Sequence, residues 1–384
     1  MDLIAKRVYT SRERPVRHVD VMLLVITFAI VIVGLILLYS ATASTLRGIH
    51  VEPFARVKKQ AVTALLGMII LLVIVTFDYR FFKVYAGFIY AGILLALILV
   101  RIPGIGASSQ GAQRWFQFGP AGGLGLQISP SEVTKVAMVF MLAAMLSELK
   151  SSTPELRDVI RVCLAAAVLM ALVFIQPDIG TTIVLVAVVV GMLVVAGTRP
   201  RHLALLAASA VILIFLAFQL NVIRSYQNDR LRVFVSGGND LTTNYNREQA
   251  LIAVASGGVL GRGYLNGPQT QLDFVPEQHT DFIFTVAGEE FGFFGALIVL
   301  TLYALLIWRC IRIAYVSKDP FGTYVAAGIA SMFAIQMFVN IGMVVGIMPI
   351  TGIPLPLMSY GGSSMLVSFA GIGVLESIHM RRFK

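Results

Sequence analysis

The sequence predicts an all-α integral membrane protein, and three observations lead to this fold class. Of the 384 residues, 58% are hydrophobic and only 13% are charged, whereas about a quarter of the residues in a soluble domain carry a charge. Ten apolar segments approach the roughly 20 residues that an α-helix needs to cross a bilayer. None of these segments alternates with a period of two residues, so helices are indicated and not the strands of a barrel.

The order of the segments predicts about ten transmembrane helices in one polytopic membrane domain, residues 1–384. The segments lie approximately at 20–40, 60–77, 83–100, 131–149, 160–176, 179–197, 203–220, 282–307, 321–345 and 363–379. A large outer loop separates the seventh helix from the eighth. A further segment, 348–364, is rich in proline and glycine and indicates re-entrant or extended backbone.

The basic residues orient these helices, because Lys and Arg concentrate in cytoplasmic loops. With a cytoplasmic N-terminus, 18 of the 30 Lys and Arg residues fall on that side, although the loops on the outer side are much longer. Both termini are therefore expected in the cytoplasm. The net charge of +10 is explained by this bias and by anionic headgroups, and no basic helix with interleaved aromatics indicates a nucleic-acid partner.

The most informative outer segment, 276–284, reads PEQHTDFIF and leads into the eighth helix. A helix that begins near Thr280 would place Asp281, Thr285 and Glu289 on one face, at positions i, i+4 and i+8. Glu289 would then lie inside the membrane, where ionised groups are costly and usually functional. Asp281 has two interpretations of equal weight, a carboxylate that caps the helix or a catalytic carboxylate.

A second polar group surrounds the start of the fourth helix. Glu132 and Lys135 are neighbours at i, i+3, so a buried ion pair that holds helices together is the favoured interpretation over a substrate site. Arg114 precedes Trp115, and such a pair can bind substrate or anchor the chain at the lipid headgroups. Pro-Asp at Asp178 is typical of a turn and helix cap.

The remaining candidates lie on the same outer side. The glycine-rich run 358–364 opens the tenth helix, where exposed amides could bind an anion, although glycine also permits close helix packing. The other polar side chains that we select as candidates for substrate binding are Arg230, Arg262, His279, Ser359 and Ser363.

Together these segments resemble the SEDS family (shape, elongation, division and sporulation) over nearly the whole chain. The matched stretches are 111–115, 129–135, 177–181, 256–263, 278–284 and 354–364. Each match alone is weak, but six in the right order on one membrane face are specific. Segments 276–281 and 349–356 look most like the rod-shape branch, RodA. Residues 127–130 depart from the family, reading Gln-Ile-Ser-Pro where Gln-Pro-Ser is usual.

The resemblance implies a peptidoglycan glycosyltransferase of the bacterial inner membrane that polymerises lipid II on the outer face during elongation. It also implies a class B penicillin-binding protein, a PBP2-type transpeptidase, as partner within the elongation machinery. The family's catalytic aspartate in the fourth outer loop falls on Asp281.

The implied chemistry assigns roles to the candidates. Asp281 would accept the proton of the attacking sugar hydroxyl, and such base catalysis typically contributes about 10²–10⁴-fold. The polyprenyl pyrophosphate leaving group requires positive charge, for which Arg114, Lys135, Arg230 and Arg262 are available. A divalent cation, Mg²⁺ or Mn²⁺, is expected as well, with ligands that the sequence does not identify.

Other functions remain open from the sequence. A lipid II flippase would use intramembrane polar residues, and the last two helices offer Gln336, Asn340 and Glu376. A non-catalytic scaffold and the division-specific, FtsW-type polymerase are further alternatives. No P-loop for ATP is present, so the energy for any reaction comes with the substrate or from a gradient.

Overall fold

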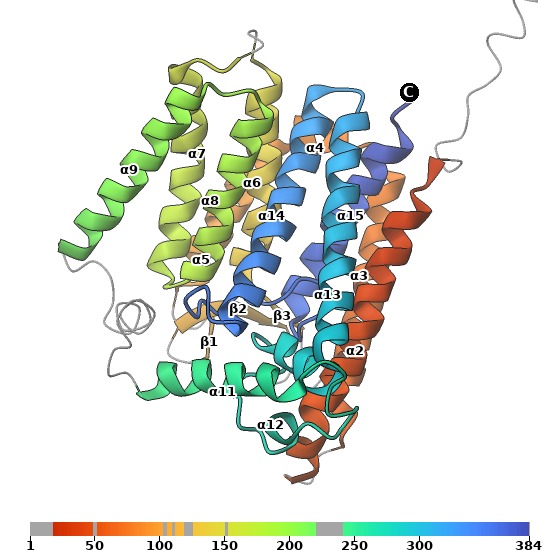
Figure 1. The fold of residues 1–384 in the computed structure, drawn as a ribbon. Helices are drawn as coiled ribbons and strands as arrows, with labels where there is room; N and C mark the ends of the chain where they lie inside the picture. The colour runs from red at the N-terminus through yellow and green to blue at the C-terminus, as the bar shows by residue number, and fades with distance from the viewer. Residues whose placement is uncertain are drawn as a thin grey trace, which may run out of the picture.

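The computed structural model describes residues 18–48, 52–102, 106–109, 112–118, 126–149, 153–219 and 241–383. Each of the ten expected segments coincides with a helix (Figure 1), which confirms the all-α membrane fold class. These helices are α2 (Val21–Gly48), α3 (Ala55–Thr76), α5 (Ala86–Leu99), α6 (Pro130–Ser147), α7 (Leu156–Ile175), α8 (Ile179–Val195), α9 (Pro200–Gln219), α13 (Ile283–Val316), α14 (Pro320–Val344) and α15 (Gly362–Met380).

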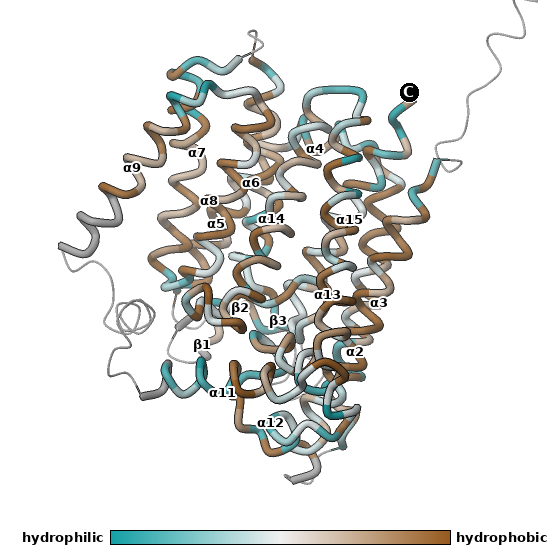
Figure 2. The backbone as a smooth tube through the Cα atoms, viewed as in Figure 1, coloured by the Kyte–Doolittle hydropathy of each residue, from teal (hydrophilic) through white to brown (hydrophobic). Residues whose placement is uncertain are grey.

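Seven of the described helices are long and apolar enough to cross a membrane, and α5, α8 and the start of α9 are shorter apolar helices. Apolar residues follow most of the length of the bundle, and hydrophilic residues collect at its two ends (Figure 2). The exact number of membrane crossings stays a prediction.

The two ends of the described chain meet at one end of the bundle. The backbone N–H of Asp20 donates to Glu376 Oε1 at 2.6 Å, and Arg309 forms an ion pair with the Asp20 carboxylate. Nδ1 of His379 lies 3.0 Å from the carbonyl oxygen of His18. This end lies opposite α11 (Leu241–Gly257) and α12 (Pro268–Gln271) (Figure 1). The arrangement fits an even number of crossings, while the side on which the termini lie stays a prediction.

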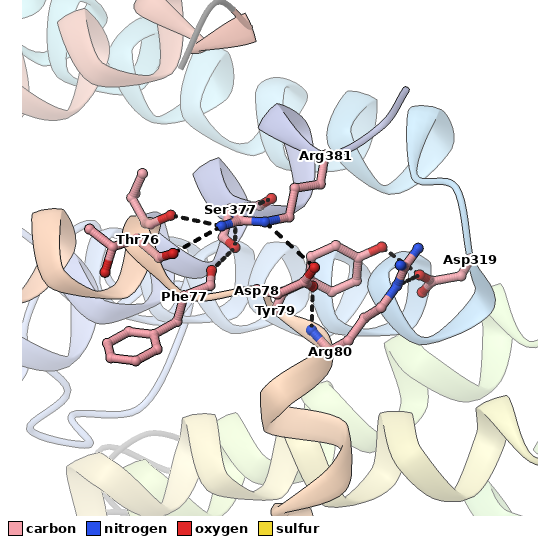
Figure 3. A network of polar contacts seen from close by, with 9 residues as sticks. Thr76, Phe77, Asp78, Tyr79, Arg80, Asp319, Ser377 and Arg381 are labelled. Atoms are coloured by element: carbon pink, nitrogen blue, oxygen red, sulfur yellow. Dashed lines mark hydrogen bonds and ion pairs between the residues drawn. The ribbon is translucent and has the colours of Figure 1, made fainter. Parts of the chain in front are cut away.

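A polar network ties four helix ends together at the same end of the bundle (Figure 3). Asp319 accepts a hydrogen bond from the Gly322 N–H at 2.8 Å and so caps α14. The same carboxylate binds the Tyr79 hydroxyl at 2.5 Å and Arg80 Nε at 3.1 Å, at the start of α4 (Arg80–Val84). Arg381, after α15, donates to carbonyl oxygens at the end of α3. The network therefore fixes α3, α14 and α15 relative to one another.

The interior of the bundle is formed by α6, α14 and α15. In the apolar stretch of α15, 89% of the residues are buried, and the share is 72% in α6 and in α14. It is only 22% in α3 and in α13. Helices α3 and α15 approach closely at Gly373, where a Cβ atom would lie 3.1 Å from Leu71 Cα. The outer helices therefore present apolar side chains to lipid, while α15 is enclosed by protein.

The end of the bundle opposite the termini carries the irregular structure. Strands β1 (Ala107–Ser109), β2 (Ala112–Phe118) and β3 (Leu126–Ile128) form an antiparallel sheet in that order. Helix α11 lies across the ends of the long helices (Figure 1). The segment 345–361 between α14 and α15 contains no helix, which agrees with the extended backbone expected from its proline and glycine.

Helix α13 is broken at Gly292, which has φ 64° and ψ −153°. The break frees backbone groups that would be unsatisfied in a bilayer, and a glycine-rich turn at 257–263 satisfies them. The Arg262 N–H donates to the Glu289 carbonyl at 2.9 Å, and the Phe293 N–H donates to the Gly258 carbonyl at 2.9 Å. Residues 283–290 thus form a buried half-helix that precedes a long lipid-facing part.

We predict that Gly292→Ala destabilises the protein. A Cβ atom here would lie 2.4 Å from the Gly261 nitrogen and 2.7 Å from the Val259 oxygen, in a backbone region that strains other residues by about 1–3 kcal/mol. Thermal unfolding in detergent measures the effect. The control is Gly87→Ala in α5, which meets nothing within 4 Å and should be neutral or stabilising by up to about 1 kcal/mol. Equal melting temperatures for the two variants would contradict the prediction.

Candidate active site

Asp281 lies in a turn before α13 and not in the helix, which corrects the expected helix start near Thr280. The helix begins at Ile283, and Phe282 occupies the cap position. The Asp281 N–H donates to the Glu277 carbonyl at 3.1 Å, and Glu277 has a φ of 51°. The expected face of Asp281, Thr285 and Glu289 is therefore not formed, and Asp281 is not the N-cap of α13.

The backbone of Asp281 is anchored, while its side chain is half-buried. Asn340 Nδ2 donates to the carbonyl oxygens of Asp281 and Ile353, each at 2.7 Å. The carboxylate lies beside Gly352, where a Cβ atom would be 3.2 Å from Asp281 Oδ2. The turn at 273–282 and the segment 345–361 thus meet at this carboxylate.

His279 lies two residues before Asp281 and is electrically neutral at physiological pH. Burial, and then the positive charge of Arg56, lower the pKa of His279 to about 4. The His279 carbonyl accepts a hydrogen bond from the Tyr360 N–H at 3.0 Å. Arg56, at the start of α3, was not selected from the sequence. Its signal was the basic run with Lys58 and Lys59 in the first turn of that helix.

Glu289 caps the short helix α12, which precedes α13. Its carboxylate accepts hydrogen bonds from the Gln269 N–H at 2.8 Å, the Thr270 N–H at 2.9 Å and the Thr270 hydroxyl at 2.6 Å. Gln278 Nε2 donates to the hydroxyls of Thr270 and Thr285, each at 3.0 Å. Both carboxylate oxygens of Glu289 are therefore engaged in holding α12 and the turn that carries Asp281.

Glu132 and Lys135 form the ion pair that their spacing favours. Lys135 Nζ lies 2.7 Å from Glu132 Oε1, and the two side chains are 2% and 13% exposed. Nearby, the Ser363 hydroxyl accepts from the Ser129 N–H at 2.9 Å and donates to the Gln127 carbonyl at 2.8 Å. Ser363 thereby joins the start of α15 to β3 and α6.

Arg114 and Asp178 hold the connection between α7 and α8. Arg114 donates to the carbonyl oxygens of Gln176 at 2.9 Å and Pro177 at 2.7 Å. Asp178 accepts from the Thr181 N–H at 3.0 Å and so caps α8, which confirms the cap interpretation of Asp178. The role of Arg114 at the headgroups or toward a substrate stays a prediction.

The other candidates are dispersed. The Ser359 hydroxyl accepts from the Leu355 N–H at 2.9 Å, inside the segment 345–361. Arg262 is exposed, and its backbone N–H donates to the carbonyl of Glu289, about two turns of helix beyond the start of α13. Arg230 lies outside the described residues. Within the described part of the chain, no three His, Cys, Asp or Glu side chains gather as a metal cluster.

The chain is similar to known proteins over nearly its whole length. The family model described as a cell cycle protein, FtsW/RodA/SpoVE, matches residues 20–384. The chain is 33% identical to a probable peptidoglycan glycosyltransferase FtsW of Geobacter metallireducens, over 96% of each chain. It is 34% identical to the peptidoglycan glycosyltransferase MrdB of Escherichia coli K12, over 95% of this chain and 94% of that one.

A solved structure described as "Structural coordination of polymerization and crosslinking by a peptidoglycan synthase complex" also matches. The TM-score is 0.81 and the sequence identity 28%, over 95% of this chain and 99% of that one. The fold and these matches define a multi-pass helical protein of the bacterial inner membrane. The chain belongs to the FtsW/RodA/SpoVE family, which confirms the resemblance of its sequence to the SEDS family.

We predict that Glu289→Gln destabilises the fold. The substitution keeps the size but turns an NH₂ group toward backbone N–H donors, and an unsatisfied buried donor costs about 1–3 kcal/mol. Thermal unfolding of the purified protein is the measurement. Glu248→Gln, an exposed position on α11, is the control and should melt with the parent protein. A Glu289→Gln variant as stable as that control would show that the cap of α12 is dispensable.

Proposed function

We propose that this chain is a peptidoglycan glycosyltransferase that polymerises lipid II on the outer face of the membrane, with Asp281 as the catalytic base. Membership in a family whose curated relatives carry that enzyme name supports the class of reaction. The observation that carries the assignment of the base is the geometry of Asp281. Its backbone is held by Asn340, while its half-buried carboxylate stands beside Gly352 at the end of the bundle opposite the termini.

The proposed reaction needs one carboxylate and a charged leaving group. Asp281 accepts the proton of the acceptor sugar hydroxyl as its oxygen bonds to the anomeric carbon of the donor. The bond from that carbon to the polyprenyl pyrophosphate breaks, and the diphosphate leaves with the electron pair. Attack opposite the leaving group inverts the anomeric centre, so an α-linked donor gives a β-linked chain.

Arg56 is the best candidate to bind the pyrophosphate. In addition to burial, its positive charge lowers the pKa of His279, two residues from Asp281. The imidazole of His279 is therefore neutral and does not compete with Arg56 for the phosphates. The charge of Lys135 is already paired with Glu132. A divalent cation, Mg²⁺ or Mn²⁺, would be held largely by the phosphates, as is usual for Mg²⁺, because the described residues offer no cluster of three ligands.

The flippase alternative is weakened by the roles of the buried polar residues that motivated it. Asn340 binds two backbone carbonyls, and Glu376 accepts from the Asp20 N–H. These side chains hold the protein together and do not form an open polar path. We assign the chain to elongation because 276–281 and 349–356 look like RodA, although relatives named for division and MrdB are similar in identity, 33% and 34%.

We further propose a single-pass class B penicillin-binding protein of the PBP2 type as partner. The similarity to a chain of a peptidoglycan synthase complex supports this. The apolar faces of the outer helices permit contact with a second membrane helix.

Asp281→Asn should lower the rate of polymerisation by about 10²-fold or more, because it removes the proton acceptor at nearly constant size. The assay is the incubation of purified protein with labelled lipid II, together with thermal unfolding. Asp273→Asn is the matched control. Asp273 is exposed at φ 57°, a conformation that Asn tolerates, so its effect should be mild. A stable Asp281→Asn protein with near-normal rate would remove Asp281 from the mechanism.

The partner should raise the activity. We expect the chain to co-purify with a PBP2-type protein and to polymerise labelled lipid II faster in that complex than alone. The control is a complex whose transpeptidase is inactivated by a β-lactam, which should still stimulate polymerisation if contact is what matters. Equal rates with and without the partner would contradict the proposal.

A further inference from the structure

The carboxamide of Asn340 joins three separate parts of the chain. Asn340 lies in α14 with 0% of its surface exposed. Its single nitrogen donates to the carbonyl oxygen of Asp281, in the turn before α13, and to that of Ile353, in the segment 345–361; both distances are 2.7 Å. One NH₂ group therefore uses both of its hydrogens to hold the two non-helical segments against one buried helix.

The chemistry of this position selects asparagine. Two carbonyl oxygens can only accept, so the nitrogen of the amide and not its oxygen must face them. Asp at this position would turn oxygens toward both carbonyls, and Ser would supply one donor for two acceptors. Asn340 and Ile353 are buried and Asp281 is half-buried, so these hydrogen bonds lie largely in a medium of low dielectric, where an unpaired carbonyl is costly.

The bond to Ile353 also fixes the neighbour of the carboxylate. Gly352, which precedes Ile353, has a φ of 74°. A Cβ atom on Gly352 would lie 3.2 Å from Asp281 Oδ2, so the glycine backbone adjoins the carboxylate. Asn340 thus holds the backbone of Asp281 from one side and the backbone beside its carboxylate from the other. Loss of the amide would release both.

We propose that Asn340 is a positioning residue that sets the Asp281 carboxylate relative to the segment 345–361; this rests on the proposed role of Asp281 as the base. Asn340 touches backbone and not the reacting atoms. A displacement of about 1 Å in a reacting group can lower a rate about 10²-fold, so the expected effect lies in kcat and not in KM.

The test measures kcat and KM with labelled lipid II, and thermal stability, for the full chain in complex with its transpeptidase. Asn340→Ala should lower kcat about tenfold to a hundredfold with KM little changed. Asn340→Asp, which keeps the size but loses the donors, should be as low. Asn340→Gln keeps the NH₂ group one methylene further out and should recover part of the activity.

Gln336→Ala is the matched control. Gln336 is also an amide, lies one turn earlier in α14 and is 2% exposed. It should lose a comparable amount of stability while kcat stays near that of the parent. A near-normal kcat for Asn340→Ala would overturn the proposal, and so would equal losses of kcat in Asn340→Ala and Gln336→Ala. If Asn340→Ala does not fold, equal activity of Asn340→Gln and Asn340→Asp would overturn it.

The outcome separates this proposal from the proposed function. An active Asp281→Asn protein would refute the role of Asp281 as the base and, with it, the reason for the positioning role of Asn340. An inactive Asp281→Asn protein beside a fully active Asn340→Ala protein would leave the base in place and refute only the positioning role.

Discussion

The structure depends on one constraint: inside a bilayer, every backbone N–H and C=O must find its partner within the protein. Regular helices meet this condition alone, but the segments that form the candidate site are not helical. The break at Gly292 is satisfied by the turn at 257–263, and the carbonyls of Asp281 and Ile353 are satisfied by Asn340. Irregular backbone is thus tolerated where side chains or turns replace the missing helical bonds.

The buried polar side chains at this end of the bundle mostly bind backbone. Gln60 Nε2 donates to the Ser359 carbonyl at 3.0 Å, and the Tyr303 hydroxyl donates to the Pro356 carbonyl at 2.5 Å. Both acceptors lie in the segment 345–361, so α3 and α13 hold it from two sides in addition to α14. The segment is therefore rigidly supported, which is a requirement for a site that must hold a reacting group within a fraction of an ångström.

Hydropathy predicted the helices well because lipid demands long apolar runs, and the start of each run is marked by loop residues. The apolar segment 282–307 also matches the start of α13 at Ile283. The separate expectation of a helix start near Thr280 was wrong, because Thr280–Phe282 belong to a turn. Gln278 holds that turn through hydrogen bonds to the hydroxyls of Thr270 and Thr285. The Glu277 carbonyl accepts from the Asp281 N–H, and Glu277 has a positive φ of 51°. A helical hydropathy pattern shows neither feature. The ion pair of Glu132 and Lys135 was predictable because it is local, at i, i+3.

The same distinction explains which site residues could be predicted. The charge of Glu289 inside an apolar segment predicted a functional role. The structure shows that Glu289 caps α12 instead, and the sequence pattern did not reveal this because the residues that it binds lie 20 and 19 positions earlier in the chain. A buried carboxylate that accepts three hydrogen bonds is already compensated and has little capacity left to bind a ligand. For Asp281, a glycine adjoins the half-buried carboxylate, and the neighbouring backbone is fixed by Asn340. The placement of this carboxylate depends on residues 59 and 71 positions further along the chain, Asn340 and Gly352, and a sequence pattern does not show that these residues are its neighbours.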